Sequence, residues 1–166
     1  MKLSSCSGIP LAAVVHLAHR RGELSCRVSG RVAELEALAL PGSAMSSDSG
    51  RGAILEGASG AVEPFDTVIA LGALHSSPDP ETLLAHIMGA LAPAGQLIFV
   101  EPSRRPGFAG RLQRRAGFDI DVVSLVRAAG FTVTNLHRAQ IETADPRYRW
   151  FVEGVAQRTT ELRAND

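Results

Sequence analysis

Two side chains able to bind or transfer a proton each follow an apolar run that predicts a buried strand. His75 comes soon after Val68–Leu71, and Glu101 directly follows Gln96–Val100. A histidine with an ordinary pKa of about 6.5 can act as a base at neutral pH, and a carboxylate at a strand end can orient a substrate. A second interpretation stays open for each residue: His75 only packs or hydrogen-bonds within its loop, and Glu101 only caps the loop.

Other reactive or charged residues are weaker candidates. His16 and His19 are spaced as neighbours on one side of a helix, but no third metal ligand accompanies them, so a surface role is expected and no metal site is predicted. Cys6 could act as a nucleophile, yet no base partner is identifiable. The arginine-rich segment Ser103–Arg115 would suit an anionic substrate or an acidic partner, although a solvated basic face is the expectation.

A strand–helix–strand unit positions the two main candidates. Phe65–Leu71 and Gln96–Val100 have the continuous apolar runs that are typical of parallel strands covered on both faces. Between them, Asp79 predicts a helix N-cap and Pro80 suits the first helical turn. The helix has one apolar stripe, made by Leu83, Leu84, Ile87, Met88 and Leu91. Ligands of parallel sheets bind outside the carboxyl ends of the strands, so the residues just after the two strands are the predicted site.

The N-terminal third of the chain has weaker patterns. We expect a helix over Leu11–Arg20, a weak strand over Glu23–Val28 and a second helix over Gly30–Leu40, where apolar residues recur every three or four positions. Pro41–Gly52 is rich in Gly and Ser and predicts a surface loop. Ala53–Glu56 is a short strand candidate.

The C-terminal third predicts a helix and a closing hairpin. Asp119–Ala129 has helical spacing, and Gly130 suits a left-handed cap behind it. Phe131–Leu136 and Trp150–Ala156 read as strands with no helix between them, so we expect them to pair antiparallel. The predicted fold class is therefore α/β: a Rossmann-like three-layer sandwich with a mostly parallel sheet and a C-terminal antiparallel hairpin.

Composition bounds the possible partners and the compartment. The 166 residues include 17 basic and 17 acidic side chains, so net charge gives no indication of nucleic acid or a membrane surface as a partner. Hydrophobic residues make up 45% of the chain, which is typical of a globular domain, but no run approaches the length of a membrane helix. The two cysteines are too few for a disulfide framework, and the N-terminus lacks a secretory pattern, so we expect a single cytoplasmic domain.

The order of several short motifs resembles the class I S-adenosylmethionine-dependent methyltransferases, in particular the small-molecule branch called type 11. That family has the patterns FDVV, LHHVPDP, LKPGG-L, EP and LLRAAGF. The similar segments here are residues 65–69, 74–80, 91–97, 101–102 and 125–131. The resemblance covers residues 53–156 best, whereas residues 1–52 are predicted to form a degenerate N-terminal part of the same domain.

Three places where the family contacts its cofactor depart from the family pattern. The family's glycine-rich turn after the first strand is similar to residues 3–10, but only Cys6 and Gly8 match it, and serines replace two glycines. The acidic residue that ends the family's second strand has no counterpart at Val28-Ser29. The family's third strand ends in Gly-Asp-Ala, whereas this chain has Glu56-Gly57-Ala58, with alanine in place of the aspartate. The resemblance thus predicts a cofactor cleft with weakened anchors.

The resemblance implies methyl transfer from S-adenosylmethionine to a small-molecule acceptor, with His75 as the catalytic residue near the acceptor. The cofactor-binding residues that it implies are Cys6, Ser7, Gly8, Gly57, Ala58, Leu71 and Gly72. One alternative is a degenerate methyltransferase-fold protein that lacks catalysis and serves as a binding or scaffold partner. A nicotinamide-binding oxidoreductase is a further alternative. Proteins of that class have a glycine fingerprint early in the chain, and they lack the closing antiparallel hairpin that is predicted here.

The start of the chain leads to an expectation about partners. Met1 falls inside the expected first strand, so the helices that often precede it in the family are expected to be missing. The cleft would then be open, and a second copy of the chain or another protein would cover it.

Overall fold

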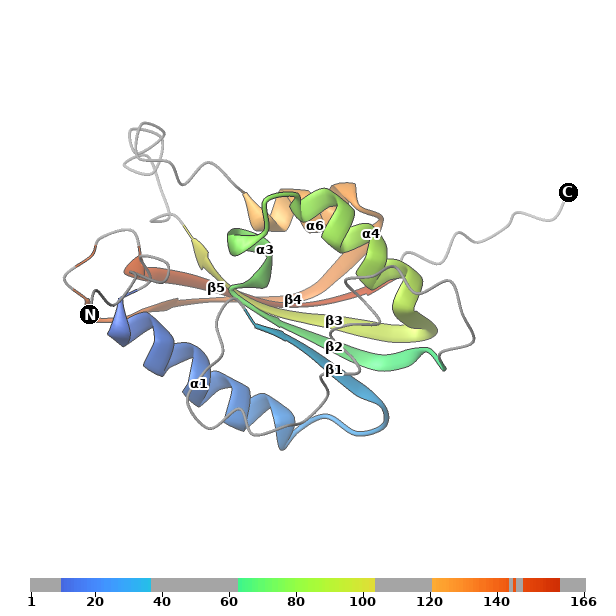
Figure 1. The fold of residues 1–166 in the computed structure, drawn as a ribbon, viewed down its shortest axis with the longest axis horizontal. Helices are drawn as coiled ribbons and strands as arrows, with labels where there is room; N and C mark the ends of the chain where they lie inside the picture. The colour runs from blue at the N-terminus through green and yellow to red at the C-terminus, as the bar shows by residue number, and fades with distance from the viewer. Residues whose placement is uncertain (1–9, 37–62, 104–120, 144, 146–147, 159–166) are drawn as a thin grey trace, which may run out of the picture.

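In the part of the chain that the structure describes, a five-stranded sheet has helices on both faces (Figure 1). The computed structural model describes residues 10–36, 63–103, 121–143, 145 and 148–158. The strands lie in the order β1-β2-β3-β5-β4. Their bounds are Val32–Glu36 for β1, Phe65–Leu71 for β2, Leu91–Ser103 for β3, Phe131–Gln140 for β4 and Trp150–Arg158 for β5.

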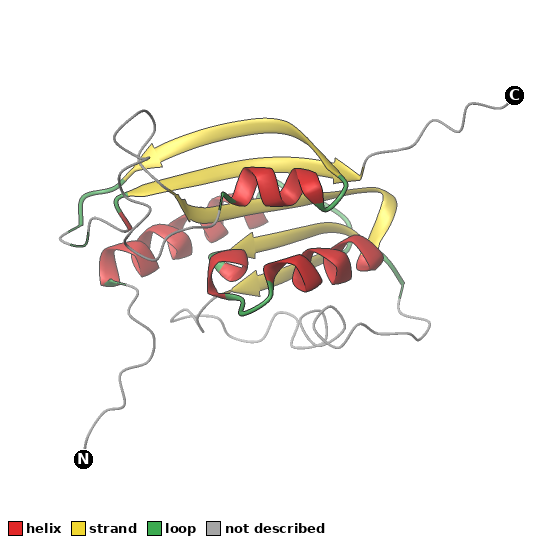
Figure 2. Ribbon diagram, turned by 90° about the horizontal axis from the view of Figure 1, so that it is seen from above, coloured by secondary structure: helices red, strands yellow, loops and turns green. Residues whose placement is uncertain are grey.

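The helices complete a three-layer sandwich. One face of the sheet carries α1 (Leu11–Ser25), and the other carries α3 (Ala73–Ser76), α4 (Pro80–Ala90) and α6 (Val122–Ala128) (Figures 1 and 2). The strands β1, β2 and β3 are parallel, whereas β5 runs antiparallel to both β3 and β4. The predicted fold class, including the antiparallel hairpin at the C-terminal end, is confirmed.

The strand–helix–strand unit forms as its caps and apolar stripe predict. The Asp79 carboxylate accepts a hydrogen bond from the Thr82 N–H at 3.0 Å, and Pro80 stands in the first turn of α4. Leu83, Leu84 and Ile87 are buried against the sheet. The helix ends at Ala90, so the buried Leu91 opens β3 rather than closing the helical stripe.

The closing hairpin is longer than its sequence pattern predicts. Asp121 accepts from the Ser124 N–H and begins α6, and Gly130 has the expected left-handed conformation with φ 90°. Both strands extend beyond the predicted bounds, to Gln140 and Arg158. The pairing of β5 with β3 extends the sheet beyond the parallel strands.

A glycine on β5 makes room for a large aromatic side chain of the core. Gly154 is the register partner of Phe99 on β3. A Cβ atom added at Gly154 would lie 2.2 Å from the ring of Phe99, which is fully buried. The aromatic ring therefore lies directly over the β5 backbone, and a side chain on β5 would compete with it for the same space.

The first helix is longer than predicted, and the strand expected over Glu23–Val28 is wrong. Helix α1 continues through Gly22, which is exposed, and it ends at Ser25. Leu24 lies two turns after Leu17, and both are buried on the side of α1 that faces the sheet. The burial of Leu24 compensates for the weak helix propensity of a single glycine.

The helix expected over Gly30–Leu40 is also wrong, because residues 32–36 form β1. Ala33 and Leu35 are buried while Val32 and Glu34 are less so, which is the period of a strand. Gly30 turns the chain into β1 with φ 87°, and a Cβ there would lie 2.3 Å from the Asp66 carboxylate. The strand candidate over Ala53–Glu56 and the loop over Pro41–Gly52 lie outside the described residues.

Two ion pairs fix α1 on its face of the sheet. The Arg20 guanidinium bonds the Glu153 carboxylate of β5, with Nε and Oε2 2.9 Å apart. Arg21 Nε lies 2.9 Å from the Glu34 carboxylate of β1, which also accepts from the Ser25 hydroxyl. The helix thus bridges strands on both sides of the central pair β2 and β3.

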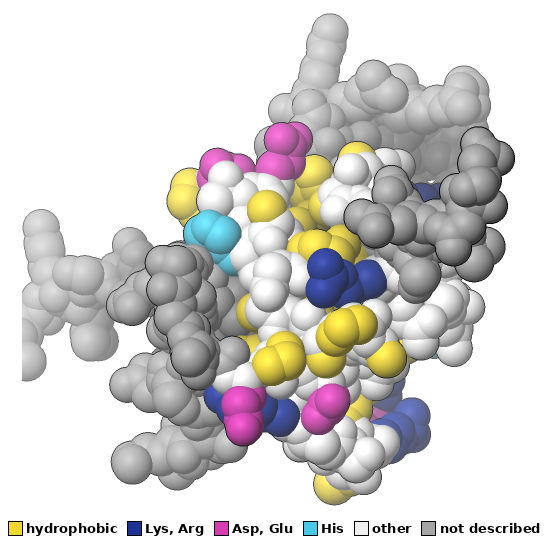
Figure 3. Space-filling model, turned by 90° about the vertical axis from the view of Figure 1, so that its right-hand side faces the viewer, with side chains coloured by type: hydrophobic (Ala, Val, Ile, Leu, Met, Phe, Trp, Pro, Cys, Tyr) yellow, Lys and Arg dark blue, Asp and Glu magenta, His cyan; other side chains and the backbone are white. Residues whose placement is uncertain are grey.

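The described surface carries mixed charge. On the face in Figure 3, acidic, basic and apolar side chains of the described residues are interspersed.

None of the described helices is long and apolar enough to span a bilayer.

Candidate active site at the carboxyl ends of the parallel strands

The carboxyl ends of β1, β2 and β3 meet at one edge of the sheet, which we call the rim. Glu36 at the end of β1 is the register partner of Leu71, and Leu71 is the partner of Val100 on β3. The chain leaves β2 through Gly72, whose φ of 67° is left-handed. The Gly72 N–H donates to the Val100 carbonyl at 2.8 Å, so the turn stays tied to β3.

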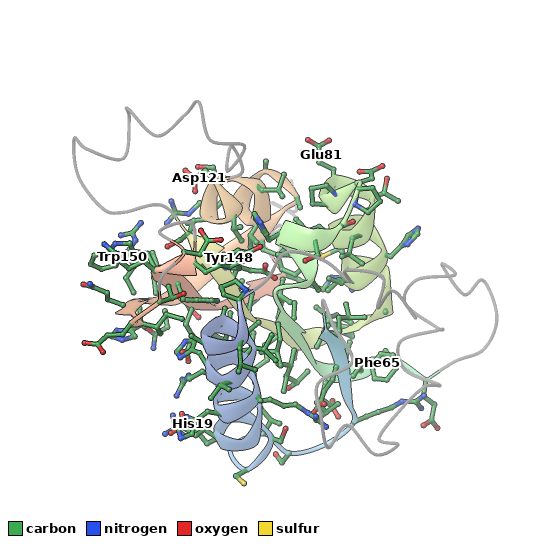
Figure 4. The ribbon with its side chains drawn as sticks, turned by 60° about the vertical axis from the view of Figure 1, so that its left-hand side comes forward. His19, Phe65, Glu81, Asp121, Tyr148 and Trp150 are labelled. Atoms are coloured by element: carbon green, nitrogen blue, oxygen red, sulfur yellow. The ribbon has the colours of Figure 1, made fainter. Side chains whose placement is uncertain are left out.

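The amino end of α1 lies toward the rim. His16 packs on Phe151 with ring centroids 4.8 Å apart, and Phe151 pairs with Pro102 near the carboxyl end of β3. One turn later Arg20 reaches Glu153, farther from the rim. The helix therefore runs antiparallel to β3, and the positive end of its dipole lies at the rim. Figure 4 shows the buried Tyr148 beside this end of α1.

His75 lies at the rim on the short helix α3. Its side chain is half-buried, and its ring meets the Tyr148 ring edge-on, with centroids 6.3 Å apart and planes at 83°. Burial lowers the pKa of His75 below its ordinary value. The imidazole is therefore mainly neutral at pH 7 and has a nitrogen lone pair that can accept a proton.

Glu101 takes the second of its two predicted roles, because its carboxylate caps a loop. The side chain is 0% exposed, and its two oxygens accept from the N–H groups of Leu74 and His75, each at 3.0 Å. Burial raises the pKa of Glu101 to about 8, and the backbone N–H groups of Leu74, His75 and Ala73 act in the opposite direction. Both oxygens face the backbone of α3, so this carboxylate holds the loop rather than a substrate.

The remaining candidates divide into placed and undescribed residues. His16 packs on Phe151, and burial followed by the nearby Arg20 charge lowers its pKa. His19 lies 3.9 Å from the Glu23 carboxylate on the exposed side of α1. Of the predicted cofactor-binding residues, Leu71 and Gly72 are buried at the rim. The others, and most of the arginine-rich segment, lie outside the described residues: Cys6, Ser7, Gly8, Gly57, Ala58 and residues 104–120.

One acidic residue at the rim escaped the sequence reasoning. Glu36 ends β1 beside Leu71, but the predicted helix over Gly30–Leu40 hid this position. The alternation of Val32 to Glu36 was the available signal, since Ala33 and Leu35 are apolar and Glu34 and Glu36 are not. An acidic residue therefore occupies the last position of a parallel strand at the rim, although not on the strand where the resemblance placed it.

Comparison with solved structures identifies the fold. A protein from Bacillus halodurans C-125, which its name assigns provisionally to the methyltransferases, matches with a TM-score of 0.50 and 16% identity, over 86% of this chain and 89% of that chain. The chain has the class I methyltransferase fold. No protein-family model matches the sequence, and no curated protein matches it significantly.

Other methyltransferase-fold structures match over part of their length. The N-methyltransferase NodS from Bradyrhizobium japonicum matches with a TM-score of 0.43 and 18% identity, over 60% of this chain and 53% of that chain. An S-adenosylmethionine-dependent methyltransferase from Thermotoga maritima matches with a TM-score of 0.48 and 15% identity, over 89% of each chain. The chain thus spans about half the length of NodS.

Proposed function

We propose that the protein transfers the methyl group of S-adenosylmethionine to a small-molecule acceptor. The observation that carries the proposal is the position of His75 and Gly72 at the carboxyl rim of a sheet with the methyltransferase fold. Ligands of such sheets bind at this rim. A small-molecule acceptor and a cytoplasmic location are part of this proposal. That a second copy of the chain or a partner protein covers the cleft remains a prediction.

The described rim has features that suit the cofactor. Gly72 lets the backbone approach a ligand without a Cβ in the way. The amino end of α1 provides partial positive charge for a carboxylate. We propose that Leu71 and Gly72 hold the cofactor together with the predicted but undescribed Cys6, Ser7, Gly8, Gly57 and Ala58.

His75 is the proposed base. The bound cofactor supplies an electrophilic methyl group, so the protein has to align the acceptor and remove its proton. The ring of His75 is mainly neutral at pH 7 because burial lowers its pKa, and its unprotonated nitrogen can take the proton that the acceptor atom loses when it gains the methyl group. Tyr148 packs edge-on against the ring and limits its motion.

Calorimetry tests the proposal directly. Titration of the purified protein with S-adenosylhomocysteine and S-adenosylmethionine should give saturable heat in the micromolar range, whereas NADH should give none. His75→Asn should keep the binding heat and lose turnover, because the imidazole contributes a proton acceptor rather than a cofactor contact. No heat with either adenosyl ligand at millimolar concentration would refute the proposal, and heat with NADH would favour the oxidoreductase alternative.

A further inference from the structure

The proposed chemistry leaves one buried ionisable group unused, the carboxyl of Glu101. The side chain is 0% exposed at the end of β3, between the sheet and the layer that contains α3. Burying a carboxyl group costs free energy unless its oxygens are hydrogen-bonded. Here each oxygen accepts one N–H from consecutive residues, Leu74 and His75. The bonded groups are the backbone of the same turn that carries the proposed base.

Helix α3 has little stability of its own. It is a single turn of four residues, and its internal bonds run from the Ser76 N–H to the Gly72 carbonyl at 3.1 Å and from the Ser77 N–H to the Ala73 carbonyl at 3.0 Å. One helical turn is marginal in water because nucleation fixes several backbone angles for few hydrogen bonds. External contacts must therefore define its orientation.

Several contacts reach α3 from the other described residues, among them the ring contact between His75 and Tyr148. The Leu74 side chain is fully buried and fastens the turn to the core, but apolar packing alone is not directional. The pair of hydrogen bonds to Glu101 is directional, since the two oxygens of one buried carboxyl group accept from two successive N–H groups. The side chain of His75 leaves the backbone at the second of these N–H groups.

We propose that Glu101 is a positioning residue of the rim, whose carboxylate fixes the orientation of α3 and thereby sets where the His75 ring stands. This inference rests on the proposed function for its catalytic meaning. The geometry also explains the choice of side chain. A glutamine has one acceptor oxygen, and its NH₂ group would face the second N–H donor. An aspartate is one methylene shorter, which places its oxygens short of both N–H groups.

The test uses Glu101→Gln in the full-length protein and two NMR readouts. Amide exchange at Leu74 and His75 should become roughly tenfold faster or more, because the glutamine leaves one of the two buried N–H groups without an acceptor. The pKa of the His75 ring should rise back toward its ordinary value, because a released α3 exposes the imidazole. Asp79→Asn is the matched control: it weakens the cap of α4, and it should leave both α3 readouts unchanged.

Each outcome bears on the inference. Unchanged exchange at Leu74 and His75 together with an unchanged His75 pKa in Glu101→Gln would overturn it, as would equal changes in Asp79→Asn. If Glu101→Gln does not fold, a pH titration of the wild-type protein decides. The amide proton shifts of Leu74 and His75 should then show a transition at the raised pKa of Glu101, separate from the transition of the His75 ring at lower pH, and the absence of the Glu101 transition would overturn the inference. Neither readout needs cofactor, so a failed adenosyl titration refutes the proposed function alone.

Discussion

At the scale of single residues, Glu101 makes stability depend on pH. Its pKa is raised from 4.5 in the unfolded chain to about 8 in the fold, so between these values the folded state keeps a proton that the unfolded chain has lost. The stabilisation is complete below pH 4.5 and is lost as pH rises through about 8. We expect the unfolding free energy of the wild type, minus that of Glu101→Gln, to fall between pH 5 and pH 8, by at most about 1.4 kcal/mol per pH unit.

Urea denaturation at pH 5 and pH 8 measures this difference. Both proteins should carry His75→Asn, because the lowered pKa of His75 adds a titration that Glu101→Gln is itself expected to change. A difference that stays constant, or that grows with pH, would show that the Glu101 carboxyl is ionised in the fold throughout this range.

At the scale of elements, α1 is held mainly by the apolar side chains that face the sheet. Leu17 is 2% exposed and packs among Ile69, Ile98 and Phe151, whereas Val15 on the same helix is 59% exposed. Leu17→Ala should lower the unfolding free energy by about 2–5 kcal/mol, because it leaves a cavity under the helix. Val15→Ala should change it by less than about 0.5 kcal/mol. Thermal or urea unfolding compares the two, and similar losses would mean that α1 is not docked as described.

The elements that could be predicted are those with several agreeing signals. The unit from β2 to β3 combines continuous apolar runs, an Asp79 cap and a first-turn proline, and the structure confirms the two strands and the helix. Val32–Glu36 was mistaken for helix because apolar residues three apart in a short segment also fit a strand. What decides there is the left-handed turn at Gly30 against Asp66, a contact between residues far apart in the chain.

The candidate site also has features that the sequence predicts and features that it does not. The positions of His75 and Glu101 follow from the rule that ligands bind at the carboxyl ends of parallel strands. The binding of Glu101 to the backbone of Leu74 and His75 could not be predicted, because it depends on how closely α3 approaches the end of β3. Tyr148 was missed for a similar reason, since only the antiparallel direction of β5 brings it beside His75.

At the scale of the whole molecule, β5 joins the hairpin to the rest of the sheet. It lies between β3 and β4 and pairs with both. A chain that ends at Asp145 should therefore lose cooperative unfolding, because the edge of β3 is uncovered and β4 has no strand beside it. Urea denaturation followed by circular dichroism measures this, and a synthetic peptide of residues 146–158 added back should restore the transition. A cooperative transition in the shortened chain alone would contradict the prediction.

The strand order also has a consequence for synthesis on the ribosome. The chain makes β4 before β5, but β4 reaches the sheet only through β5. While β5 is still inside the exit tunnel, the ten residues of β4 have no strand to pair with, so their backbone groups stay hydrogen-bonded to water. Tyr148 also emerges after β4, so the histidine that it packs against acquires this neighbour only after β2, β3 and β4 have been made.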